Sequence, residues 1–355
     1  MVLCVYKRKG DTEVANLIGL FEIAKIAEVT TAAVTNWTKR YDDFPKPAME
    51  VQAGKFYNSD QVHSWLRKRG KIMGAKIICF INLKGGVAKT TTTVGTATLL
   101  AGEFGKKVLV VDLDPQTNCT TMLIGEEKWK ELDDNNYTLA SLFEDVINDT
   151  KLFEMEKTLQ KNVSQITNVT NLDLIPSSLK MIDIQDRLAT ISPGKFFSNN
   201  PTDIIKRALK PIINDYDYVL IDCPPNMGLI TLNGLRISDG YIIPTIPDVL
   251  STYGIPQIIN RVKEFSDNIG ENIECLGIVA TKVRGQSSLH MRTLDVLQRG
   301  KKDAEMFDTV FYENNQMGEA AECVPVTTLR QKWGYQGQYD RFYNFANEIM
   351  QKVEV

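Results

Sequence analysis

The sequence predicts an α/β protein with a doubly wound, mostly parallel sheet and a small separate domain before it. From about residue 76 onward, short runs rich in Val, Ile and Leu alternate with helical segments, which is typical of a parallel sheet covered by helices on both faces. Before that point the chain reads as short helices and one hairpin. A basic, glycine-punctuated stretch at residues 67–74 separates the two patterns. We therefore predict two domains, residues 1–74 and residues 75–355.

The first domain is predicted to be a winged helix-turn-helix unit. Residues 20–27 and 31–39 have helical apolar spacing and are separated by a tight turn, so the second helix can enter the major groove of DNA. Residues 49–57 read as a hairpin around Ala53 and Gly54, and a helix over residues 59–69 closes the unit. This arrangement resembles the winged helices of the MerR and excisionase type.

The exposed face of the second helix is the candidate DNA-reading surface. Its polar side chains can donate hydrogen bonds and charge to bases and phosphates; they are Thr31, Thr35, Asn36 and Lys39. Residues 1–75 contain 12 Lys and Arg against 8 Asp and Glu, whereas the whole chain has a net charge of −3. Trp37 and Trp65 are interpreted as core residues. Because helix-turn-helix patterns also occur in helical domains that bind no DNA, that alternative stays open.

Cysteine usage and hydropathy indicate a cytoplasmic protein without a membrane partner. The six cysteines are scattered and form no C-x-x-C pair, which favours free thiols over metal ligands or disulfides. No apolar run approaches the roughly 18 residues of a membrane span, and the first residues lack the apolar core of a signal peptide.

Residues 81–93, INLKGGVAKTTTT, predict a phosphate-binding loop between a strand over residues 76–83 and a helix that begins at Lys89. A glycine pair supplies the positive φ angles that such a turn needs. The backbone N–H groups that can face an anion at the helix N-terminus belong to Gly85, Gly86, Val87 and Ala88.

The side chains that follow the loop complete a nucleotide site. Lys89 can reach the β- and γ-phosphates, the Thr90 hydroxyl can ligate Mg²⁺, and Thr91 lies next to it. The usual pattern G-x-x-x-x-G-K-[ST] would have glycine at positions 83 and 88, where this chain has Leu83 and Ala88. An ordinary glycine turn followed by a lysine is the alternative.

Residues 84–90 read K-G-G-x-x-K-[ST], which resembles the deviant Walker A motif of the ParA/MinD class of P-loop ATPases. In that class, the lysine that matches Lys84 crosses a dimer interface and contacts the nucleotide of the other subunit. The resemblance implies a P-loop NTPase fold, ATP or ADP with Mg²⁺ as cofactors, a homodimer and slow ATP hydrolysis. Ala88 departs from the glycine usual in the class, and we interpret its methyl group as tolerated because the backbone donor is intact.

Two later strands end in carboxylates. A strand over residues 107–113 leads into D-L-D-P-Q, which matches a ParA segment and contains Asp112 and Asp114; the two point the same way if the strand stays regular. The resemblance places Asp114 beside the attacking water, as a base or water-positioning group, and Asp112 near the metal. Residues 218–225 resemble the Walker B strand, in which Asp222 would hold Mg²⁺ directly or through water.

The likeness extends over about residues 76–330 and implies a plasmid or chromosome partition ATPase associated with the nucleoid. An ATP-bound dimer would bind DNA non-specifically, and a ParB-type centromere-binding protein would stimulate hydrolysis. The first domain would bind an operator and repress the protein's own transcription. Candidate residues for the non-specific DNA contacts are Arg292, Arg299, Lys301 and Lys302.

Two other functions remain open at this point. One is a transcriptional repressor that only senses the nucleotide, and the other is a MinD-like positioning ATPase. The latter needs a basic amphipathic C-terminal helix. Residues 339–355 contain only two basic residues, Arg341 and Lys352, and carry a net negative charge, so we expect a helix that docks on the protein. Thr281 and Lys282 follow a predicted strand over residues 276–280 and are candidates for adenine contacts.

Overall fold

The computed structural model describes residues 17–27, 29–51, 54–71, 74–190, 200–299, 304–335 and 337–353. By its internal contacts the chain separates into two compact units, residues 1–74 and residues 75–355.

The small unit combines helices with a three-stranded antiparallel sheet in the order β1-β3-β2. Its elements are β1 (Leu17–Gly19), α1 (Leu20–Ile26), α2 (Thr31–Arg40), β2 (Met49–Val51), β3 (Gly54–Asn58) and α3 (Ser59–Lys68). Thr30 caps α2, since its hydroxyl accepts a hydrogen bond from the backbone of Ala33. The two helices, the hairpin strands and the closing helix lie where the sequence predicts them. Ala53, at the predicted turn, lies outside the described residues.

Aromatic side chains form the core of the small unit. Trp65 is 5% exposed, and its ring lies 4.8 Å from that of Phe44 and 5.8 Å from that of Trp37, between centroids. Val62 and Leu66 of α3 are fully buried beside them. The interpretation of Trp37 and Trp65 as packing residues is therefore confirmed.

The large unit is built on a seven-stranded sheet in the order β10-β9-β8-β4-β7-β5-β6, and every ladder within its described residues is parallel. The strands are β4 (Lys76–Phe80), β5 (Val108–Asp112), β6 (Leu172–Ile175), β7 (Tyr218–Asp222), β8 (Gly240–Thr245), β9 (Glu274–Val283) and β10 (Met306–Tyr312). β4 is central, which brings the segment after it between the ends of β7 and β8.

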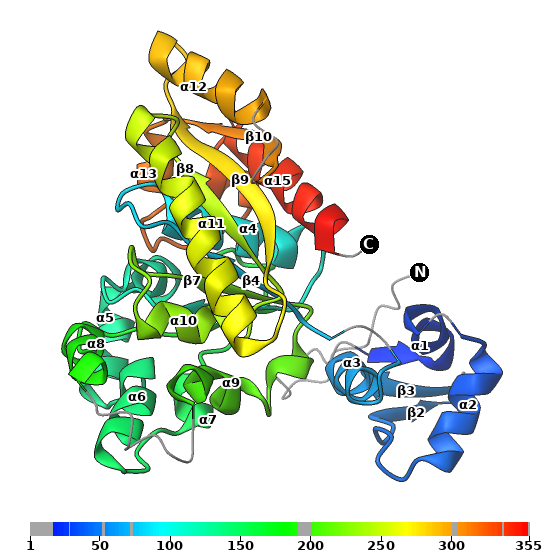
Figure 1. The fold of residues 1–355 in the computed structure, drawn as a ribbon. Coiled ribbons are helices and arrows are strands. Elements are labelled where there is room, and N and C mark those ends of the chain that lie inside the picture. Colours follow the sequence, from blue (N-terminus) through cyan, green and yellow to red (C-terminus); the bar gives the residue numbers. More distant parts are fainter. Residues whose placement is uncertain are drawn as a thin grey trace. The chain divides into compact units, whose positions relative to one another are not determined.

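Helices cover both faces of this sheet (Figure 1). The longer ones are α4 (Lys89–Gly102), α5 (Asn118–Asp134), α6 (Leu139–Asn148), α8 (Met181–Thr190), α11 (Val249–Ile269), α12 (Ser288–Arg299) and α15 (Gln338–Val353). The shorter ones are α7 (Met155–Thr158), α9 (Ile204–Leu209), α10 (Leu229–Leu235), α13 (Gln316–Glu319) and α14 (Leu329–Trp333), with 3-10 turns η2 (Pro201–Asp203) and η3 (Ile213–Asp215). One core joins α4, α5 and α15 to the sheet, and a second joins α6, α8, α10 and α11 to its other face. The predicted doubly wound α/β fold is confirmed.

The C-terminal helix α15 packs on the protein through its apolar face. Phe342, Phe345, Ala346 and Ile349 are fully buried against α4 and β10. Gly95 of α4 makes room for this helix, because a Cβ there would lie 2.1 Å from the Phe342 ring. The expectation of a docking helix is confirmed. No helix in the described part of the chain is long and apolar enough to cross a bilayer.

Strand boundaries differ from the prediction where polar contacts replace the sheet ladder. β4 ends at Phe80, not at residue 83, because the Asn82 amide donates to the carbonyl of Pro244 at 2.8 Å and so leaves the strand pattern. Thr281 and Lys282 lie inside β9, which continues to Val283, so the prediction that they follow a strand was wrong. β1 and β10 were not predicted.

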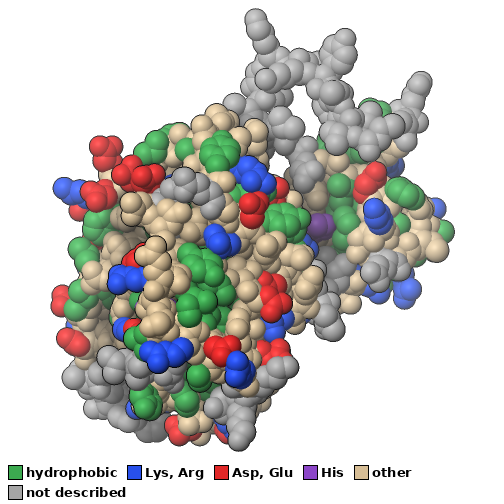
Figure 2. Space-filling view, turned by 90° about the horizontal axis from the view of Figure 1, so that it is seen from above, with side chains coloured by type: hydrophobic (Ala, Val, Ile, Leu, Met, Phe, Trp, Pro, Cys, Tyr) green, Lys and Arg blue, Asp and Glu red, His purple; other side chains and the backbone are tan. Residues whose placement is uncertain are grey.

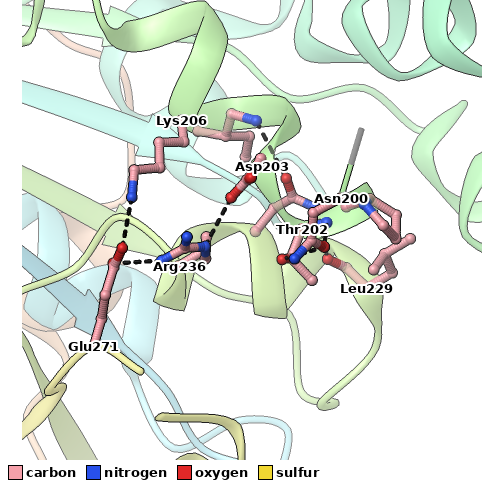
Figure 3. A network of polar contacts seen from close by, with 10 residues as sticks. Asn200, Thr202, Asp203, Lys206, Leu229, Arg236 and Glu271 are labelled. Carbon is pink, nitrogen blue, oxygen red and sulfur yellow. Dashed lines mark hydrogen bonds and ion pairs between the residues drawn. The ribbon is translucent and has the colours of Figure 1, made fainter. Parts of the chain in front are cut away.

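A charged network fixes the helices behind β7 at the end remote from the phosphate loop (Figure 3). Arg236, just after α10, contacts the carboxylates of Asp203 at 2.7 Å and Glu271, and Lys206 contacts Glu271 at 2.9 Å. The Arg236 side chain is only 12% exposed, so these contacts anchor the C-terminal end of α10. That helix begins a few residues after Asp222, and its position determines where the intervening loop runs.

Candidate functional site

The loop between β4 and α4 has the geometry of an anion cradle. Gly86 has φ 74° and Ala88 has φ 61°, both left-handed, whereas Gly85 does not adopt a positive φ. The glycine pair thus supplies one of the two unusual angles, not both. Ala88 occupies a backbone conformation that glycine adopts without cost, which gives the physical reason why glycine would suit this position better.

The loop is fastened to the sheet by side chains from other strands. The Thr281 hydroxyl of β9 donates to the carbonyl of Val87 at 2.9 Å and is 1% exposed. Asn82 accepts a hydrogen bond from the backbone N–H of Lys84 at 2.9 Å. Thr281 therefore positions the loop, a role that differs from the predicted adenine contact.

Lys89 is buried at the centre of this loop. Its ammonium donates to the carbonyl oxygens of Asn82 and Lys84, each at 3.3 Å, and the residue is 6% exposed. Burial lowers the pKa of Lys89, while the carboxylates of Asp222 and Asp114 act in the opposite direction. A cation in this position can neutralise the phosphate oxygens of a nucleotide.

Thr90 and Asp222 form a pair suited to Mg²⁺. The Thr90 hydroxyl donates to Asp222 Oδ2 at 2.7 Å, and Asp222 Oδ1 is buried without a hydrogen-bond partner. Burial raises the pKa of Asp222 well above its ordinary value, and the carboxylate of Asp112 raises it further. An orphaned buried carboxylate oxygen next to a hydroxyl fits a magnesium ion. The described residues contain no cluster of three or more His, Cys, Asp and Glu that could hold a metal. Protein sites for Mg²⁺ commonly use one or two side chains together with phosphates and water.

Asp112 and Asp114 lie close together but in different settings. β5 ends at Asp112, so the regular strand that would align the two side chains stops there; instead the backbone N–H of Asp114 donates to Asp112 Oδ1 at 3.0 Å. Asp112 Oδ2 accepts hydrogen bonds from both the backbone N–H and the hydroxyl of Thr120, at 2.9 and 2.6 Å.

Burial raises the pKa of Asp112 to about 7 and also raises that of Asp114. Asp114 lies against the phosphate loop, where a water-activating group would be needed.

Two adjoining cavities provide room for a nucleotide. The first, of 470 Å³, is lined by loop residues including Gly85, Lys89 and Thr90, together with Asp114. The second, of 490 Å³, continues along β9 and β10 past Phe311 and Asn315. Ala88, Thr91 and Lys282 line both cavities, which makes them one groove. Both volumes fall within the usual range for small-molecule sites.

The Lys84 side chain pairs with a carboxylate of the same subunit. Its ammonium forms an ion pair with Asp248 Oδ2 at 2.5 Å, and the two side chains are 39% and 27% exposed. Asp248 lies in the loop that joins β8 to α11. Sequence reasoning gave Asp248 no role, although it lies within the segment that resembles ParA, because it is 164 positions from Lys84 along the chain.

In the small unit, the predicted DNA-reading residues share the outer face of α2. Thr31, Asn36 and Lys39 are exposed. Thr35 is half-buried, and its hydroxyl donates back to the carbonyl of Thr31 at 2.9 Å, so it has less freedom to contact DNA. Val34 faces the core.

The candidate cluster for non-specific DNA binding is only partly visible. Arg299 pairs with Asp295 at 2.7 Å, and Arg292 donates to the carbonyl of Ser288, both on the exposed side of α12. Lys301 and Lys302 lie outside the described residues. On the face seen in Figure 2, the Lys and Arg side chains of the described residues are interspersed with Asp and Glu.

Comparisons with known proteins identify the family of this chain. The family model of the AAA domain matches residues 75–275. The chain is 32% identical over 246 residues to the sporulation initiation inhibitor protein Soj of Bacillus subtilis. The aligned residues make up 69% of this chain and 87% of Soj. It is 26% identical over 252 residues to the chromosome partitioning protein ParA of Myxococcus xanthus, covering 71% and 80% of the two chains.

Solved structures show the same fold. Cobyrinic acid a,c-diamide synthase from Mycobacterium smegmatis, with a bound ATP analog and magnesium, superimposes with a TM-score of 0.60 at 22% identity, covering 79% of this chain and 97% of that one. A putative plasmid partition protein from Borrelia burgdorferi bound to AMPPNP gives a TM-score of 0.56 at 21% identity, covering 79% and 100%. The phosphate loop, the parallel sheet and the close relatives lead to one assignment: the chain belongs to the ParA family of P-loop ATPases.

Proposed function

We propose that this protein is a partition ATPase that segregates a plasmid or chromosome by switching with ATP between a monomer and a DNA-binding dimer. The Thr90–Asp222 pair supports this most directly, because it places a hydroxyl and an orphaned carboxylate oxygen beside the buried Lys89. Bound magnesium would neutralise phosphate charge there. The relatives include proteins named for chromosome partitioning.

Hydrolysis is proposed to depend on Asp114 and Lys84. Asp114 would orient or deprotonate the attacking water, and Asp112, held by Thr120, would keep the end of β5 in place next to Asp222. Lys84 of one subunit would neutralise transition-state charge at the nucleotide of the other, and so complete the deviant Walker A motif. Turnover is expected to be slow until a ParB-type centromere-binding protein stimulates it.

The small unit is proposed to be a winged helix-turn-helix domain that binds the protein's own operator. The outer face of α2 offers Thr31, Asn36 and Lys39 to base edges and phosphates. The ATP-bound dimer is proposed to bind bulk DNA through phosphate contacts, with Arg292, Arg299, Lys301 and Lys302 as candidates, which would account for association with the nucleoid.

The molecular mass in solution with no nucleotide, with Mg-ADP and with Mg-ATP tests the proposal. We expect a monomer in the first two conditions and a dimer in the third, together with measurable release of phosphate. A constant mass without turnover would refute the partition ATPase. If operator binding then still responded to nucleotide, the protein would be a nucleotide-sensing repressor.

A further inference from the structure

Two carboxylates contact the phosphate loop from opposite sides. β4 lies between β8 and β7 in the sheet. At the end of β7, Asp222 accepts a hydrogen bond from Thr90, and after β8, Asp248 pairs with Lys84. Asp222 has a role at the proposed magnesium site, whereas nothing in the proposed mechanism requires Asp248.

Lys84 is held at two points to the same strand end of its own unit. Its ammonium lies 2.5 Å from Asp248 Oδ2. Its backbone N–H donates to Asn82, and the amide of Asn82 donates to the carbonyl of Pro244 in β8 at 2.8 Å. The backbone contact fixes where the side chain starts, and the ion pair fixes where its charge lies.

We infer that Asp248 is a positioning residue that holds Lys84 on its own subunit and so opposes dimer formation until nucleotide is bound. This inference rests on the proposed function, in which Lys84 contacts the nucleotide of a second copy of the chain. The Asp248 carboxylate and a nucleotide phosphate compete for the same ammonium charge. A contact that is stronger in the monomer than in the dimer shifts the equilibrium toward the monomer.

The size of the effect follows from the exposure of the pair. Both side chains are partly accessible to solvent, at 39% and 27%, so screening by water weakens the ion pair. Removing the carboxylate should therefore lower the protein concentration at half-dimerisation by about two- to five-fold. High salt should reduce the difference in this concentration between wild type and the variant without the carboxylate, since salt screens exposed ion pairs.

The test compares wild type with Asp248→Asn. Asp267→Asn, at an exposed position of α11, is the control for loss of one negative charge. Dimerisation is measured by sedimentation of the full chain in Mg²⁺ with a slowly hydrolysed ATP analog. We expect the protein concentration at half-dimerisation, the midpoint, to fall about two- to five-fold for Asp248→Asn and to stay unchanged for Asp267→Asn. An unchanged or higher midpoint for Asp248→Asn overturns the inference.

A second readout needs neither nucleotide nor dimer. Acetylation of Lys84 by an amine-directed reagent, followed by mass spectrometry of the nucleotide-free protein, should be faster in Asp248→Asn, with Lys128 as the unchanged internal reference. Equal Lys84 reactivity in both proteins would contradict the ion-pair model.

Failure of the proposed function would give a different result: wild type would then not dimerise with the analog at all, or Lys84→Ala would dimerise as well as wild type.

Discussion

The Thr90 hydroxyl donates a 2.7 Å hydrogen bond to the Asp222 carboxylate and thereby joins the first turn of α4 to the end of β7. The two residues are separated by 132 positions in the chain. The parallel ladder between β4 and β7, in register from Lys76 with Tyr218 to Phe80 with Asp222, brings them together. The sheet thus brings together, at the carboxyl ends of neighbouring strands, the two residues that we propose as magnesium ligands, and ligand sites of open α/β folds lie at this edge.

Replacing Thr90 by Val should uncouple nucleotide binding from magnesium. Valine keeps the shape of the side chain but removes the hydroxyl, so ADP affinity measured by calorimetry should fall about ten-fold in Mg²⁺. In EDTA the affinity should match that of wild type. An equal loss in both buffers would indicate a damaged loop and would exclude Thr90 from the magnesium site.

The nucleotide-free protein should lose stability between pH 3.8 and about 7 through Asp112. Burial raises the pKa of Asp112 from 3.8 to about 7, so the folded state holds a proton that the unfolded chain has lost in this window. The free energy of unfolding should therefore fall as pH rises, by at most about 1.4 kcal/mol per pH unit from this group, and level off above pH 7. Urea unfolding at several pH values checks this. Asp112→Asn should have a flatter slope than wild type, and identical slopes would contradict the assignment.

The two lysines of the loop should have separable effects. Lys89→Ala should weaken ADP binding itself, by about a hundred-fold, because a buried cation next to the phosphates is lost. Lys84→Ala should bind ADP nearly as wild type does and yet neither dimerise with ATP nor hydrolyse it. Fluorescent-nucleotide titration and phosphate release measure the two properties. Wild-type turnover in Lys84→Ala would exclude a role for Lys84 in hydrolysis.

Two DNA-binding activities should coexist in separate parts of the chain. Changing both Asn36 and Lys39 to alanine should abolish operator binding and spare ATP-dependent binding to random DNA. Changing Arg299, Lys301 and Lys302 to alanine should do the reverse. Because phosphate contacts release counterions, the second activity should fall steeply with salt and should not depend on the DNA sequence. Gel shifts with both DNAs at two salt concentrations test this, and loss of all DNA binding on deletion of residues 1–75 would disprove it.

The sequence was sufficient for the strands of the large sheet that read as continuous apolar runs, but not for β10 at one edge of that sheet or for β1 of the small unit. Central strands such as β5 and β7 are buried on both faces and read as continuous apolar runs, so they were predicted nearly to the residue. β10, at the edge, alternates between buried and exposed positions, and β1 has only three residues. A search for continuous apolar runs does not detect such strands.

The candidate site likewise contains residues that the sequence could predict and contacts that it could not. Residues within one local motif, such as Lys89 and Thr90, could be predicted because their spacing along the chain is itself the signal. The contacts of Thr281 and Asp248 with the loop could not be predicted, since they span 194 and 164 positions of the chain and only the folded sheet brings these residues there. The left-handed angle at Ala88 was also hidden, because glycine and alanine differ there in backbone strain and not in hydrogen bonding.

Complementation between two inactive variants tests most directly the claim that two subunits share each ATPase site. Lys84→Ala lacks the lysine that would act on the partner, and Asp114→Ala lacks the group that would activate water and should form an ATP-bound dimer without turnover. In a mixed dimer, one site combines Asp114 from the first variant with Lys84 from the second.

The measurement is phosphate release by each variant alone and by an equimolar mixture. Each alone should be inactive. Lys84→Ala should not pair with itself, so it can enter a dimer only with Asp114→Ala, and each mixed dimer has one complete site out of two. The mixture should therefore restore part of the wild-type rate, at most about half of it. A mixture as inactive as its components, although mixed dimers form, would contradict a site shared between subunits.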